Sequence, residues 1–325
     1  MKRLFAMLLC LCMALGLAAC GGGTAAPSES GGDGKSFTVG ICQLVQHPAL
    51  DAATKGFKDA LEKLLPGQVT FKEGNASGES ANCATIVNGF VSDNVDLIMA
   101  NATAALQAAA SATDSIPVLG TSITAYSVAL DLDGFDGTVG GNVSGTSDLA
   151  DLEQQAQMVK DWFPEAQKVG LLYCSAEPNS IYQVEKMTEY LTALGFTCKP
   201  FTFMDSNDVT SVTQKACDAS DVLYIPTDNT AANNTEAIAN VVIPAGVPVA
   251  VGEEGICTGC GVCTLSISYY DLGYTTGEMA AKILTGEADI STLPVSYTTC
   301  TPKYNADMCE TMGIAPVEGY EPIGD

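Results

Sequence analysis

Basic residues and histidine are scarce in this chain of 325 residues. It has 14 lysines and arginines against 38 aspartates and glutamates, and a single histidine, His47, so its formal net charge is −24. A surplus of negative charge repels polyphosphate backbones, so nucleic acid is not an expected partner. With only one imidazole, most general-base schemes would have to rest on carboxylates.

The motifs of common enzyme classes are also missing. The chain has no G-x-S-x-G elbow, no H-E-x-x-H zinc motif, no Walker loop and no G-x-G-x-x-G after its first apolar strand, FTVGICQL. We therefore expect neither an enzymatic activity nor a cofactor.

The first 20 residues, MKRLFAMLLCLCMALGLAAC, are typical of an export signal. Lys2 and Arg3 form a basic start, an apolar run follows from residue 4 to 17, and small residues lead to Cys20. The apolar run is shorter than the roughly 20 residues that span a bilayer. Because the last four residues resemble a bacterial lipobox, residues 1–19 are predicted to be cleaved and Cys20 to carry a lipid. An ordinary cleaved signal with an incidental cysteine is the alternative.

Residues 20–36 contain only small and polar side chains after the cysteine, GGGTAAPSESGGDGKS, which predicts a flexible tether. From Phe37 onward no segment is apolar for long enough to span a bilayer. The body is therefore expected outside the cytoplasm, anchored through Cys20 to the outer face of the cytoplasmic membrane.

Short apolar runs alternate with amphipathic stretches from Phe37 onward. This alternation predicts βαβ units and a parallel sheet. Strands are expected at FTVGICQL, VTFKEG, VDLIMA and IPVLG, and helices at residues 48–64, 79–91 and 103–112.

The same order recurs in the second half of the chain. Strands are expected at KVGLLY, TCKPFTF, DVLYI and VPVAV, and helices at residues 179–194, 208–219 and 230–243. Two copies of one α/β unit predict a molecule of two Rossmann-like lobes. A cleft between such lobes would be lined by the loops at the carboxyl ends of their strands, where ligands of parallel sheets bind.

Six stretches resemble, in the same order, the substrate-binding lipoproteins of ABC transporters, in particular the group with tryptophan-binding members. They cover most of the chain from Phe37 to Glu287: VGICQLVQHPALDAATKGF, VDLIMANATAALQAA, GGNVSGTSDL, KVGLLYCSAEPNS, LYIPTDNTAA and ISYYDLGYTTGEMAAKILTGE. The resemblance implies the type I periplasmic-binding-protein fold, an α/β fold of two lobes with parallel sheets joined by three crossovers. It also implies a monomeric receptor that delivers a small ligand, in characterised relatives an aromatic amino acid, to the transmembrane subunits of a permease. A ligand-sensing receptor of the same fold is the alternative.

The three crossovers of that fold divide the body. We place them near Asn142, Leu265 and Leu293. The N-terminal lobe would then comprise residues 37–142 plus 266–292, and the C-terminal lobe residues 143–265 plus 293–325.

Strand-end loops of the first lobe supply one set of candidate ligand contacts. Gln43 offers an amide, His47 an imidazole, and Thr103 opens a helix whose N-terminus suits a carboxylate, although capping of that helix is an alternative use. Many relatives have an aspartate where this chain has Ala125. The candidates in this lobe are Gln43, His47, Asn101, Ala102, Thr103, Ser122, Thr124 and Ala125.

Matching loops of the second lobe supply the other set. Asp228 is the first choice for a ligand ammonium and Glu253 the second, because a desolvated cation needs an opposite charge. Capping of the following helix is the alternative role of Asp228. Tyr269 is a candidate to stack on a ligand, although tyrosines at helix starts more commonly pack. The candidates from the second lobe and the segment after it are Glu177, Asn179, Ser180, Thr227, Asp228, Asn229, Thr230, Glu253 and Tyr269.

The stretch CTGCGVC places Cys257, Cys260 and Cys263 at the two-residue spacing of iron-sulfur and zinc sites. A cluster of four thiolates would need a further ligand, Cys217, Cys300 or Cys309, and the stretch lacks the C-x3-C-P continuation. We therefore expect no metal, and a flexible glycine-containing turn that shapes the cleft wall near the hinge.

Overall fold

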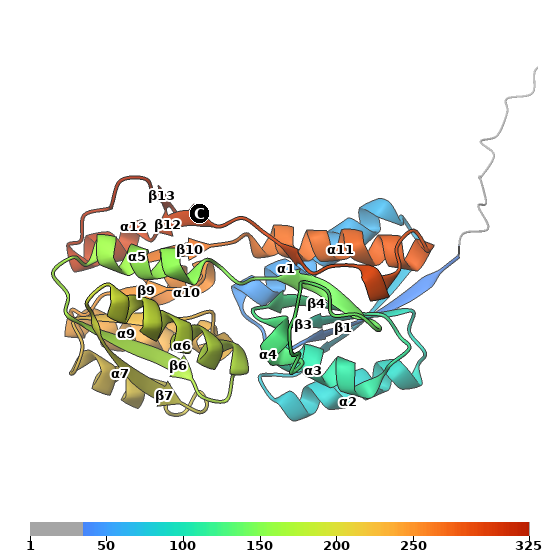
Figure 1. Ribbon diagram of the computed structural model, residues 1–325, viewed down its shortest axis with the longest axis horizontal. Coiled ribbons are helices and arrows are strands. Elements are labelled where there is room, and N and C mark those ends of the chain that lie inside the picture. Colours follow the sequence, from blue (N-terminus) through green and yellow to red (C-terminus); the bar gives the residue numbers. More distant parts are fainter. Residues whose placement is uncertain (1–34, 325) are drawn as a thin grey trace, which may run out of the picture. The chain divides into compact units, whose positions relative to one another are not determined.

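The structure, a computed structural model, describes residues 35–324. The predicted signal and Cys20 lie outside the described residues. Within residues 35–324 no helix is both long and apolar enough to cross a membrane. The described chain forms two parallel-stranded sheets with flanking helices (Figure 1), which confirms the predicted α/β fold of two lobes.

The first lobe contains a six-stranded parallel sheet in the order β11-β5-β4-β3-β1-β2. Strands β3 and β4 are buried along their whole length, so their sequences, LIMAN and VLGTSI, lack the apolar and polar alternation of a half-exposed strand. The strands are β1 (Phe37–Gln43), β2 (Val69–Asn75), β3 (Leu97–Asn101), β4 (Val118–Ile123), β5 (Val143–Ser147) and β11 (Ser296–Tyr297). The helices are α1 (Pro48–Leu64), α2 (Ser80–Ser92), α3 (Thr103–Ala112), α4 (Tyr126–Ala129) and α11 (Tyr269–Thr285), with a 3-10 turn at Ile290–Thr292.

Helices α1 and α11 run side by side in Figure 1 although more than 200 residues separate them in the sequence. Glycines make this approach possible, since a Cβ on Gly56 would collide with the Tyr270 carbonyl and a Cβ on Gly273 with the Ala53 carbonyl. Helices α1 and α11 pack against each other and together cover one face of the sheet of the first lobe.

The second lobe contains a seven-stranded sheet in the order β13-β12-β10-β9-β8-β6-β7, in which only β12 is antiparallel to its neighbour β10. The strands are β6 (Lys168–Cys174), β7 (Thr197–Phe203), β8 (Val222–Ile225), β9 (Val249–Val251), β10 (Cys263–Ser266), β12 (Thr301–Tyr304) and β13 (Glu321–Pro322). The helices are α5 (Leu152–Trp162), α6 (Pro178–Ala193), α7 (Val209–Cys217), α8 (Asn229–Ala232), α9 (Thr235–Ala245), α10 (Glu254–Cys260) and α12 (Ala306–Met312).

The lobe boundaries differ from those placed on the sequence. Strand β5 pairs with β4, and β11 pairs with β5, so both strands belong to the first sheet. The chain therefore crosses between sheets after Ser147 and after Tyr297, rather than near Asn142 and Leu293, whereas the second crossing, after Ser266, lies near Leu265 as placed. The first and third boundaries differ from the prediction because they depend on which strands pair. The sequence of one segment does not reveal its pairing partner.

Two local expectations also change. The helix expected at 230–243 is divided into α8 and α9, because Asn234 leaves the helical conformation and its amide bonds to the Thr230 carbonyl and to Ser206. The expected turn CTGCGVC instead supplies the last residues of α10 and the start of β10. Helix α10 begins because the Glu253 carboxylate accepts hydrogen bonds from the backbone N–H groups of Gly255 and Ile256.

Candidate functional site

A small cavity of about 10 Å³ lies where strand-end loops of the two lobes meet. Most of its lining side chains are buried. The lining residues are His47, Leu50, Ser122, Thr124, Asp148, Asn179, Thr227, Asp228, Asn229, Ala232, Glu253 and Tyr269. We call this space the inner cavity.

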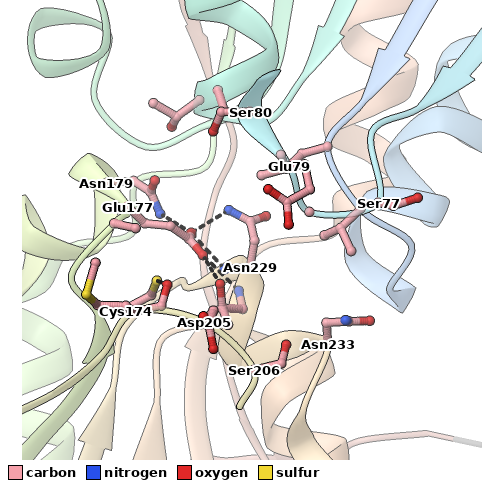
Figure 2. Close-up of a pocket in the computed structure, with 18 of the residues that line it drawn as sticks. Ser77, Glu79, Ser80, Cys174, Glu177, Asn179, Asp205, Ser206, Asn229 and Asn233 are labelled. Atoms are coloured by element: carbon pink, nitrogen blue, oxygen red, sulfur yellow. Dashed lines mark hydrogen bonds between the residues drawn. The ribbon is translucent and has the colours of Figure 1, made fainter. Parts of the chain in front are cut away.

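Many of the residues selected from the sequence line this cavity. The structure brings together His47, Ser122, Thr124, Asn179, Thr227, Asp228, Asn229, Glu253 and Tyr269. A larger space of about 410 Å³, the outer cavity, shares Asn179 and Asn229 with it and is also lined by Thr103, Glu177 and Thr230. Figure 2 shows this outer cavity, with Glu79 and Ser80 opposite Glu177 and Asn179. Neither cavity is lined by Gln43, Asn101, Ala102, Ala125 or Ser180.

Gln43 and Asn101 bind the start of helix α1 instead. The Gln43 amide nitrogen donates to the Val45 carbonyl at 2.8 Å and to the Asp51 carboxylate at 2.7 Å. The Asn101 amide nitrogen donates to the Leu50 carbonyl at 2.9 Å. These bonds hold the helix start that carries His47 into the inner cavity.

Two residues near strand ends of the first lobe have a strained backbone. Ala102 has φ of 88° and Ser122 has φ of 56°, a region that side chains other than glycine rarely adopt. Ser122 lies where the pairing of β4 with β5 shifts register, and its hydroxyl is buried without a hydrogen-bond partner. The irregular strand end thus places an unsatisfied hydroxyl in the lining of the cavity.

Asp228 and Glu253 are buried carboxylates whose oxygens are occupied by backbone donors. Asp228 accepts from the N–H of Ala231 at 2.8 Å and of Cys174 at 2.7 Å, so it caps α8, as the alternative reading of the sequence held. Burial raises the pKa of Asp228 to about 8 and that of Glu253 to about 7. No salt bridge in residues 35–324 pairs either group with a lysine or arginine.

Asp148 is a third carboxylate in the cavity lining, which the sequence did not single out. Its side chain is 4 % exposed, and its Oδ2 accepts a hydrogen bond of 2.9 Å from the Tyr269 hydroxyl. Its Oδ1 is buried without a partner. Burial raises the pKa of Asp148, and the Thr124 and Tyr269 hydroxyls oppose that shift. Asp148 was missed from the sequence because no strand was predicted at residues 143–147, so the aspartate was not recognised as a strand-end residue.

Three polar atoms of the lining are therefore buried and unpaired: His47 Nδ1, Ser122 Oγ and Asp148 Oδ1. Buried polar groups are normally hydrogen-bonded, and leaving one unsatisfied costs about 1–3 kcal/mol. A carboxylate oxygen only accepts hydrogen bonds, so this set suits a ligand that brings a donor, and with buried acids around it a positively charged one.

The thiols of CTGCGVC are not grouped for metal binding in the part of the chain that the structure describes. Cys257, Cys260 and Cys263 are each buried, and burial raises the pKa of all three thiols. Metal ligation requires thiolates, which this environment disfavours. In the part of the chain that the structure describes, no group of three or more His, Cys, Asp or Glu side chains is arranged to hold a metal ion.

Residues 38–316 match the family model of the ABC transporter substrate binding protein. The chain belongs to this family. A tyrosine-binding protein of Clostridioides difficile (strain R20291) is 33% identical over 270 residues, which cover 81% of this chain and 76% of that protein. This ABC transporter substrate-binding protein is thus a member of a non-enzymatic class that binds solutes outside the cytoplasm for an importer.

Solved structures of similar sequence share the fold. One, from Streptococcus pneumonia in complex with L-Trp, has a TM-score of 0.84 at 30% identity and covers 89% of this substrate-binding protein and 100% of its own chain. A ligand-free, open structure of a substrate-binding protein with adhesive properties from Clostridium difficile has a TM-score of 0.68 at 33% identity, with 88% and 99% of the two chains covered. These likenesses agree with the family resemblance of the motifs and with the two-lobed fold.

Proposed function

We propose that this substrate-binding protein captures an aromatic L-amino acid between its two lobes, at the side chains that line the inner cavity, and delivers it to the transmembrane subunits of an ABC permease. The lobes would have to part to admit it, since the inner cavity is smaller than an amino acid. The observation that carries the proposal is the unpaired Oδ1 of Asp148 in a cavity with three buried acids. The names of the relatives, which refer to tyrosine and L-Trp, support the class of side chain.

The ligand ammonium is assigned to Asp148 rather than to Asp228. Both oxygens of Asp228 already accept backbone hydrogen bonds, whereas Asp148 retains a free acceptor. A desolvated ammonium next to an ionised carboxylate forms the stronger, charge-assisted type of hydrogen bond. Asp228 and Glu253 then cap α8 and α10 and make no direct contact with the ammonium.

Other residues that line the inner cavity can contact the carboxylate and the side chain of the ligand. The unpaired Ser122 hydroxyl can donate to the carboxylate of the amino acid, and Leu50 and Ala232 supply apolar surface for the side chain. Thr103, at the N-terminus of α3, lies in the outer cavity, where a ligand that enters would pass.

Attachment to the membrane is part of the proposal. The lipobox-like residues before Cys20 support cleavage there and acylation of the cysteine, which would keep the monomeric receptor beside its permease at the outer face of the cytoplasmic membrane.

Calorimetry with the mature protein and a panel of L-amino acids tests the function. We expect one-site binding of L-tyrosine, L-tryptophan or L-phenylalanine, and no binding of 3-(4-hydroxyphenyl)propionate, which lacks the ammonium. Binding of none of the three amino acids would overturn the ligand class, and equal binding of the deaminated analogue would overturn the ammonium site.

A further inference from the structure

One side-chain hydrogen bond joins the two lobes across the cavities. Nε2 of His47, the residue before α1, lies 3.3 Å from Oδ1 of Asn229, the first residue of α8. His47 is only 7 % exposed, and its other ring nitrogen, Nδ1, is buried without a partner in the inner cavity lining. The role of Nδ1 depends on which ring nitrogen carries the proton.

Glu177 holds Asn229 in place. Its Oε2 accepts from the Asn229 backbone N–H at 3.0 Å and from the Asn229 amide nitrogen at 2.7 Å. Its Oε1 accepts from the Thr230 backbone N–H and hydroxyl, both at 2.8 Å, and Oε2 also accepts from the Asn179 amide at 3.2 Å. Figure 2 shows the carboxylate between the labelled side chains of Asn179 and Asn229. Every one of these partners is a donor.

This arrangement determines the orientation of the Asn229 amide. A carboxylate that receives five hydrogen bonds accepts only, so the NH₂ group of Asn229 must face Glu177 and its oxygen must face His47. An amide oxygen only accepts, so Nε2 of His47 must carry the proton. In the neutral imidazole Nδ1 is then a bare acceptor.

The surroundings favour that neutral form. Burial lowers the pKa of His47, while the bond to Asn229 and the charges of Glu177 and Asp51 oppose the shift. The other titratable side chains that line the same cavity are Asp148, Asp228, Glu253 and Tyr269. No lysine or arginine lines it.

We propose that Glu177 is a positioning residue for ligand capture: through Asn229 it selects the Nε2–H form of His47, so that Nδ1 accepts a hydrogen bond from an N–H or O–H group of the ligand. The inference rests on the proposed function, because His47 is among the inner cavity lining residues at which the ligand is proposed to bind. It assigns Glu177, selected from the sequence as a ligand contact, an indirect role.

The single histidine of the chain makes the test direct, provided that the protein carries no histidine tag. Long-range ¹H–¹⁵N correlation spectra of protein labelled at histidine identify the protonated ring nitrogen, and calorimetry gives the affinity for L-tyrosine. With ligand bound we expect the Nε2–H pattern in the wild type. Glu177→Gln should shift the spectrum toward a mixture of both forms and weaken binding roughly 3- to 10-fold, the effect of about one hydrogen bond.

Glu185→Gln is the matched control, since Glu185 lies exposed on helix α6, which begins directly after Glu177, and the change should leave spectrum and affinity unchanged. Asn229→Ala is the second variant, which removes the acceptor itself and should also abolish the Nε2–H preference. If Glu177→Gln fails to fold by circular dichroism, Asn229→Ala decides the question. If both variants fold and show the same spectra and affinity as the wild type, the inference is overturned and the proposed function stays intact.

Failure of the wild type to bind L-tyrosine, L-tryptophan and L-phenylalanine would overturn the proposed function instead. The spectra of the ligand-free protein would then still test the positioning role. A difference between wild type and Glu177→Gln in the Nε2–H fraction would support it, and identical spectra would overturn it.

Discussion

The Tyr269 hydroxyl donates a hydrogen bond of 2.9 Å to Oδ2 of Asp148. Tyr269 begins helix α11, and Asp148 directly follows strand β5, so the bond joins two segments next to chain crossings between the sheets. Because this hydroxyl occupies one carboxylate oxygen, the other remains as an unpaired acceptor in the inner cavity lining. A hinge-side contact thus orients the acid proposed to bind the ligand.

Replacement of Asp148 by asparagine should weaken amino-acid binding about 10- to 100-fold, because a charge-assisted hydrogen bond becomes a neutral one with a mispositioned donor. Calorimetry measures the loss. Asp133→Asn, at an exposed aspartate of the same lobe, should bind as the wild type does. Unchanged affinity in Asp148→Asn would contradict the assigned ammonium site.

Replacement of Asp228 by alanine should act mainly on stability. The variant loses the cap of α8 and leaves the buried N–H of Cys174 without its acceptor, so we expect a loss of about 1–3 kcal/mol in the free energy of unfolding. Urea denaturation measures it, and Asp228→Asn, which keeps one acceptor oxygen, should lose less. If Asp228→Ala lost more affinity than Asp148→Asn, Asp228 rather than Asp148 would be the residue that binds the ligand ammonium.

The stability of the ligand-free protein should fall as the pH rises from about 4, the ordinary carboxyl pKa, to about 8. Asp228 and Glu253 have raised pKa values in the folded state, so the folded protein binds more protons than the unfolded chain within this window. Their contribution is fully present below the unfolded pKa and is lost as the pH passes the folded values. Thermal unfolding across this pH range would show it, and a midpoint that rises throughout the window would contradict it.

A substitution at the α1–α11 contact should destabilise the first lobe. Gly273→Ala places a methyl group against the Ala53 carbonyl, and overpacking of this kind typically costs about 1–3 kcal/mol. Gly89→Ala in α2 is the matched control, because its Cβ would meet nothing within 4 Å and alanine favours helix. Chemical denaturation should lower the stability of the first variant and leave the second equal to or above the wild type. Equal stability of both variants would show that the helices can separate without cost.

Much of the candidate site was accessible to sequence reasoning because loops after parallel strands share one edge of a sheet. That rule selected His47, Thr124, Asn229 and Glu253, which the structure brings to one cavity. It also selected Gln43, whose amide is engaged with Val45 and Asp51, since a strand-end position does not reveal the direction of a side chain. The rule missed Asp148, because no strand was predicted at residues 143–147, where β5 pairs with β4.

The sequence by itself determined the α/β alternation, the repeated lobes and the acidic balance, since periodicity and composition are properties of contiguous residues. Only the tertiary structure decided which acids keep a free oxygen and which cap a helix. Asp148, Asp228 and Glu253 are chemically similar, but backbone donors occupy both oxygens of the last two and only one oxygen of Asp148 accepts a bond. Hydrogen-bond partners come from segments distant in the chain, so the role of each buried carboxylate is settled by packing rather than by its neighbours in sequence.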